Sequence, residues 1–63
     1  MSGTEKRLLG DLRKAQAKLA ASLYEMSEHE TDPNAKQTLR DLGIIARLTA
    51  SVISTHLLRL WAE

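Results

Sequence analysis

The sequence of 63 residues contains no cysteine and no phenylalanine, and its only aromatic residues are Tyr24 and Trp61. Without cysteine, neither a disulfide framework nor a thiolate metal site can stabilise so short a chain. Two histidines are too few for a dedicated imidazole metal cage. Nine basic residues against eight acidic residues leave a formal net charge of +1. This balance argues against a protein that coats a polyanion, and it gives no strong attraction to membranes.

Long hydrophobic stretches are also scarce. No apolar run approaches the ~18 residues that a membrane span needs. The first residues, MSGTEKRLLGDLRK, lack the apolar core and the small-residue cleavage site of a secretion signal. We therefore expect a soluble cytoplasmic protein that has no membrane partner.

The one proline marks the one clear break in a sequence that otherwise favours helix. Asp32 can accept hydrogen bonds from the amides that open a helix, and Pro33 suits the first helical position because no N–H is needed there. Thr31 or Asp32 is therefore expected as the N-cap. The preceding segment is rich in Ala, Leu, Lys and Glu, which are strong helix formers. We predict one all-α domain over residues 1–63, an antiparallel two-helix hairpin with helices at about 4–30 and 33–62 and a turn at 31–32.

The first expected helix carries one apolar stripe opposite a charged side. Its members recur at steps of three and four, which is the spacing of a seam between packed helices. They are Leu8, Leu9, Leu12, Ala15, Leu19, Leu23 and Met26. We expect this stripe to be the buried face of the helix.

The second expected helix is apolar over more of its circumference. One seam consists of Ala35, Leu39, Leu42, Ala46, Ile53, Leu57 and Leu60. About a third of a turn away, Ile45, Leu48 and Val52 form a second group that His56 bridges. A helix of this kind is normally buried on more than one side.

Chain length indicates what covers the second side. Sixty-three residues lie near the lower size limit for independent folding, and two elongated rods bury less surface than a sphere of the same mass. We therefore expect two hairpins to form a homodimeric four-helix bundle with a two-fold interface. The expected interface residues are Leu39, Leu42, Ile45, Ala46, Leu48, Val52, Ile53, His56 and Leu60.

Small residues form a ridge on the second helix, at Gly43, Ala46, Ala50 and Ser54. Such a ridge lets two helices approach closely, but alanine is also simply a good helix former, and both interpretations stay open. Glycine costs up to ~1 kcal/mol relative to alanine inside a helix, which favours a packing role for Gly43.

Polar residues give no pattern that indicates catalysis. Glu25, Glu28, His29 and Glu30 fit a solvated helix end, and they do not supply the Glu-x-x-His pairs of di-iron bundles. No Gly-rich phosphate loop or strained nucleophile turn is present. We expect no enzymatic activity, no cofactor and no metal site. Trp61 is expected to cap one end of the bundle or, alternatively, to anchor a partner protein.

Basic residues on the first helix support an alternative function, a small regulatory dimer that binds RNA or DNA. The candidate contacts are Lys6, Arg7, Arg13, Lys14 and Lys18. Because no aromatic side chain accompanies them, only salt-sensitive contact with phosphates is expected. The favoured interpretation is a non-enzymatic, self-associating hairpin that acts as a structural or protein-interaction module. A further alternative is a subunit of a larger hetero-complex.

The segment LRKAQAKLAASLYEMSEHETDPNAKQTL resembles a family of short proteins of spore-forming Firmicutes, described as domain of unknown function 1657. The resemblance rests on Leu12, on AQAKL at Ala15–Leu19, on the acidic segment before the turn and on AKQ at Ala35–Gln37. It covers about the first two thirds of the chain. It implies a bacterial helical hairpin and transfers no active site.

Overall fold

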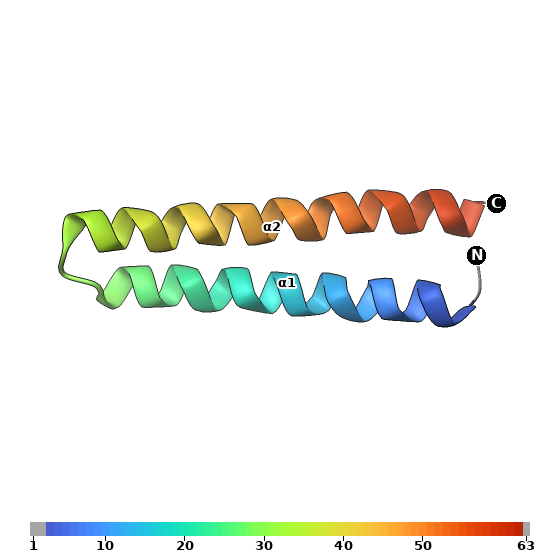
Figure 1. Cartoon of the computed structure of the whole chain (residues 1–63), viewed down its shortest axis with the longest axis horizontal. Helices are drawn as coiled ribbons and strands as arrows, with labels where there is room; N and C mark the ends of the chain where they lie inside the picture. Colours follow the sequence, from blue (N-terminus) through green and yellow to red (C-terminus); the bar gives the residue numbers. More distant parts are fainter. Residues whose placement is uncertain (1–2, 63) are drawn as a thin grey trace.

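The computed structural model describes residues 3–62 as two long helices. Helix α1 (Gly3–His29) and helix α2 (Pro33–Ala62) run antiparallel beside each other along their whole length (Figure 1). The hairpin measures 47 × 15 × 10 Å between its Cα atoms. The expected all-helical hairpin is confirmed, and each helix end lies within one residue of its expected position.

Glu30 organises the turn between the helices. Its carboxylate oxygen Oε1 accepts hydrogen bonds from the backbone N–H groups of Thr31 (3.0 Å) and Asp32 (3.1 Å). The carbonyl oxygen of Asp32 accepts the first backbone bond of α2 from the amide of Lys36, at 2.9 Å. Asp32 is therefore the N-cap residue, and Pro33 takes the first helical position, where no N–H is required.

The contact between the helices is built largely from small side chains. Ala20 and Leu23 of α1 form a buried cluster with Ala46 of α2, and Tyr24 and Leu39 pack against it. Further along α2, Ala50, Ile53 and Leu60 are buried, whereas Leu42 of the expected seam is 45% exposed. Apart from Leu42, the face of α2 that packs on α1 is the one that its apolar spacing predicts.

The expected buried stripe of α1 is wrong for most of its members: Leu23 is buried and Leu9 is half-buried, but the others are exposed. Leu8, Leu12, Leu19 and Met26 are half-exposed, and the buried residues of α1 are Ala20, Leu23 and Ser27. Counted in steps of 100° per residue, the leucine-rich stripe is centred about 90° from the face that contacts α2. Small side chains occupy that contact face because they allow the two backbones to approach closely. The larger apolar side chains consequently lie along the side of the hairpin.

The small-residue ridge of α2 lies in this contact. Gly43, Ala46 and Ala50 are buried, and Ser54 is half-buried. A Cβ atom on Gly43 would lie 3.1 Å from Cε1 of Tyr24, which is closer than ordinary van der Waals contact. The ridge therefore sets how closely the helices of one chain approach, which supports the packing interpretation of Gly43.

Candidate interaction surface

Large apolar side chains are exposed on both helices. We use the term apolar face for Leu8, Leu12, Leu19 and Met26 of α1 together with Leu42, Ile45 and Val52 of α2. Each of these side chains is between 45% and 68% exposed. Monomeric soluble proteins rarely expose so many large apolar side chains in one contiguous area.

Helical geometry places the two halves of the apolar face on the same side of the hairpin. Each stripe is rotated by about 90–110° from the contact between the helices, in the same numerical sense. Both helices are right-handed and they run in opposite directions, so equal numerical rotations turn the two stripes toward one side. The apolar face is therefore one surface rather than two.

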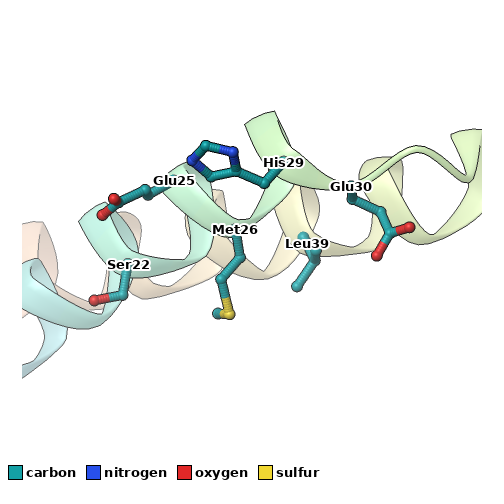
Figure 2. Close-up of a pocket in the computed structure, with 6 residues that line it drawn as sticks. All are labelled: Ser22, Glu25, Met26, His29, Glu30 and Leu39. Carbon is teal, nitrogen blue, oxygen red and sulfur yellow. The ribbon is translucent and has the colours of Figure 1, made fainter.

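Two grooves confirm that side chains from both helices meet along this surface. At the open end of the hairpin, His56 of α2 lines a groove with Leu8, Leu9 and Leu12 of α1, and Glu5 completes the lining. At the turn end, Met26 of α1 and Leu39 of α2 line a second groove, where Figure 2 shows both side chains pointing to the same side. The apolar face therefore extends over most of the length of the hairpin.

The structure places the expected interface residues in two groups. Ala46, Ile53 and Leu60 are already covered within one chain, and Leu39 is half-buried. The exposed residues are Leu42, Ile45, Leu48, Val52 and His56. Leu48 lies toward the outer edge of α2, at about 170° from the contact with α1.

The contribution of α1 to this surface is not expected from the sequence. Leu8, Leu12, Leu19 and Met26 are expected on the buried face of the first helix and are therefore absent from the expected interface. Their spacing does identify them as one stripe. The spacing does not show whether the stripe faces the other helix of the same chain or another molecule.

The turn-end groove also contains polar side chains. Ser22, Glu25, His29 and Glu30 complete its lining, and Glu25 and His29 lie on the side of α1 away from Met26 (Figure 2). Glu25, Glu28 and His29 are exposed, whereas Glu30 is half-buried by the turn. Within residues 3–62, no three histidine, aspartate or glutamate side chains are grouped so that they could hold a metal ion.

Lys6 and Trp61 connect the two helices at the open end. The Lys6 Nζ atom lies 4.5 Å from the centroid of the Trp61 ring, within the range of a cation–π interaction. The Trp61 side chain is nevertheless 70% exposed. Within one chain, Trp61 therefore covers little of the core and presents most of its ring to the surroundings.

The basic residues of α1 do not form one surface. Lys6 lies over Trp61, and Arg13 is half-buried on the side of α1 that contacts α2. Arg7, Lys14 and Lys18 are exposed on the outer side of α1. The proposed nucleic-acid contacts are thus divided between two sides of the helix.

Helix α2 is long and apolar enough to cross a membrane when its hydropathy is averaged. An 18-residue window has a mean hydropathy of 1.2 with at most two charged residues, and 11% of that window is buried in the hairpin. Core helices of soluble proteins meet the same criteria. Length and composition therefore leave two environments open for α2.

Comparison of the chain with protein-family models, with curated proteins and with solved structures finds no match. The resemblance to the Firmicutes family therefore stays a prediction.

Proposed function

We propose that this chain is a non-enzymatic helical hairpin that associates with a second copy through its apolar face, forms a four-helix bundle and acts as a structural or protein-interaction module. The observation that carries the proposal is the exposure of seven large apolar side chains on one side of a single hairpin. In a four-helix bundle each helix contacts two neighbours, and the apolar face occupies the position of the second contact.

Surface area supports the same conclusion. The accessible surface of the chain is 4742 Å², whereas a compact monomer of 7.0 kDa would expose about 4,000 Å². The broad side of the hairpin, which carries the apolar face, has a Cα outline of 47 × 15 Å, or about 700 Å². A stable protein interface buries about 800 Å² on each partner, so this face has a suitable size for a dimer.

Charge on α2 favours a protein partner over a lipid bilayer. Arg47 lies near the middle of the 30-residue helix Pro33–Ala62, and it is exposed. An arginine in a membrane helix costs up to about 2.5–3.5 kcal/mol on insertion scales, with the largest cost at the centre. In a bundle, the same side chain stays in water at no such cost.

The first test measures mass and helicity. Light scattering after gel filtration should give at least twice 7.0 kDa for the purified chain, and circular dichroism should show a helical protein. A helical species of 7.0 kDa that melts cooperatively when dilute would contradict the proposal. A poorly helical monomer would instead support the hetero-complex alternative, and flotation of the chain with lipid vesicles would support a membrane location.

Matched variants test which surface is used. Ile45→Glu places a charge on the apolar face and should convert the dimer to a monomer, because an unpaired buried carboxylate is strongly disfavoured. Leu58→Glu is the control: Leu58 is 71% exposed and lies on the opposite side of α2. Equal masses for the two variants would show that the apolar face is not the interface.

A further inference from the structure

Charge along the hairpin is distributed unevenly between its two ends. Residues 25–41 at the turn end contain five acidic residues against two basic residues, Lys36 and Arg40. At the open end, Lys6 of α1 lies over Trp61 in the last turn of α2, which also contains Arg59, and Arg7 follows Lys6 on the outer side of α1. A second copy therefore meets opposite charge if its open end lies over the turn end of the first copy.

Helix α2 shows the same difference in charge, with acidic Asp41 toward the turn end and basic Arg59 toward the open end. They are eighteen residues apart, which is five full turns of an α-helix, so they point in the same direction. Both side chains are exposed, beside the stripe that includes Ile45 and Val52. The carboxylate of Asp41 is oriented by a hydrogen bond from Nε2 of Gln37 to its Oδ1 atom, at 2.9 Å.

From these observations we infer that the two hairpins pack antiparallel, with a two-fold axis perpendicular to the helices at the level of Ala50, so that Asp41 of each copy lies level with Arg59 of the other. This inference rests on the proposed self-association and specifies its geometry. Asp41 lies nine residues before Ala50 and Arg59 lies nine residues after it. A two-fold axis at this level therefore generates two equivalent ion pairs, each between Asp41 of one copy and Arg59 of the other.

The apolar side chains of α1 fit the same axis. Gly43 lies against Tyr24, so Ala50, which lies seven residues after Gly43, is level with Ala17 and within about 3 Å of the level of Ala15. Ala15 is exposed, and a small side chain near the axis allows α1 of the two copies to approach closely. Leu12 and Leu19 lie on either side of Ala15. An antiparallel arrangement therefore brings Leu12 of each copy close to Leu19 of the other.

The parallel arrangement has an axis along the hairpin and lacks these matches. It brings the two acidic turn ends together and the two basic open ends together. Repulsion between like charges at both ends disfavours the parallel arrangement. Attraction between opposite charges favours the antiparallel arrangement and selects that orientation. Charge therefore distinguishes two bundles that would bury the same apolar face.

Distance between turns tests the inference directly. Because the chain has no cysteine, Asn34→Cys carries the only spin label in each copy, at an exposed position. Asn34 lies sixteen residues from Ala50, so an antiparallel dimer separates the two labels by about 48 Å at ~1.5 Å per residue. A parallel bundle holds them about 14 Å apart, the diagonal of helices that pack 8–10 Å from one another.

Double electron–electron resonance on the labelled protein should give a distance of about 48 Å between the two labels. A distance near 14 Å in a dimer would overturn the antiparallel geometry. Light scattering on the same sample reports the mass separately. A labelled monomer would contradict the proposed self-association itself, so failure of the two proposals can be distinguished.

Charge reversal tests the pairing without a label. Asp41→Arg and Arg59→Asp should each raise the dimer dissociation constant on the order of tenfold, because each variant creates two like-charge pairs in the dimer. The double variant should restore the dissociation constant to within about threefold of the original value. A double variant as weak as the product of the two single effects would show that these residues do not pair.

Discussion

Gly43 of α2 lies directly against the aromatic ring of Tyr24 in α1. A Cβ atom at position 43 would be 3.1 Å from Cε1, 3.3 Å from Cδ1 and 3.3 Å from Cζ of that ring. Gly43 is buried, whereas the ring of Tyr24 is only half-buried. The pair shows how this hairpin combines a large residue on one helix with the absence of a side chain on the other.

We predict that the effect of Gly43→Ala depends on Tyr24. Alanine favours helix over glycine by up to ~1 kcal/mol, but its methyl group must displace the ring by a few tenths of an ångström. In the original chain the two effects should nearly cancel. In a Tyr24→Ala background, Gly43→Ala should raise the free energy of unfolding by about 1 kcal/mol. Urea denaturation of the four proteins at one concentration measures the difference, and equal effects in both backgrounds would contradict the contact.

Ser27 sets a second limit on side-chain size. It is 1% exposed, and its hydroxyl donates a hydrogen bond to the carbonyl oxygen of Tyr24 at 2.6 Å. Ser27→Ala removes one hydrogen bond and should lower the free energy of unfolding by no more than about 1 kcal/mol. Ser27→Leu must fit extra methyl groups into the helix contact and should cost about 1–3 kcal/mol. Thermal melting followed by circular dichroism would show the order, and a leucine variant that equals the alanine variant would contradict tight packing at this position.

The contact of Lys6 with Trp61 should hold the open end of the hairpin together. An exposed cation–π pair contributes about 0.5–1 kcal/mol. Lys6→Met removes the charge and keeps most of the side chain, so hydrogen exchange should accelerate in the last turn of α2. Exchange near Ala20, in the buried cluster, should not change. Lys14→Met is the control, because Lys14 is exposed on the outer side of α1. The same acceleration in both variants would exclude a specific contact.

His56 should weaken the proposed dimer relative to an apolar residue. It lines the open-end groove with Leu8, Leu9 and Leu12, where association would remove its imidazole from water. His56→Leu should lower the dimer dissociation constant on the order of tenfold, because each dimer buries two such side chains. Thr55→Leu adds a leucine at an exposed position that does not line the groove and should have little effect. Sedimentation at several protein concentrations compares the variants, and tighter association of both would indicate a general effect of hydrophobicity.

The course of the chain could be predicted because its signals are local. Pro33 and the residues before it specify where one helix ends and the next begins, and helix-forming composition accounts for the rest. The face of α2 that contacts α1 also followed from spacing, with Ala46, Ile53 and Leu60 buried as expected. In each of these cases the information lies within one helix or one turn.

The orientation of α1 could not be predicted in the same way. Hydrophobic spacing identified the stripe that includes Leu12 and Leu19, but both side chains are nearly half-exposed. What turns α1 is the fit between Ala20 and Ser27 on one helix and the small-residue ridge on the other, which depends on two segments at once. In a short chain, the contact between two helices cannot cover every apolar stripe. Which stripe is exposed is therefore determined by how the two helices pack together.

The antiparallel course of α1 and α2 brings the start of the first helix and the end of the second to the same end of the hairpin (Figure 1). In the proposed antiparallel bundle, the open ends of the two copies point in opposite directions, and their Ala62 residues, each twelve residues from the axis at Ala50, lie about 36 Å apart at ~1.5 Å per residue. A cargo domain fused to either terminus would then be held at a fixed distance from its twin. The bundle would serve as a rigid spacer whose length is set by the number of helical turns.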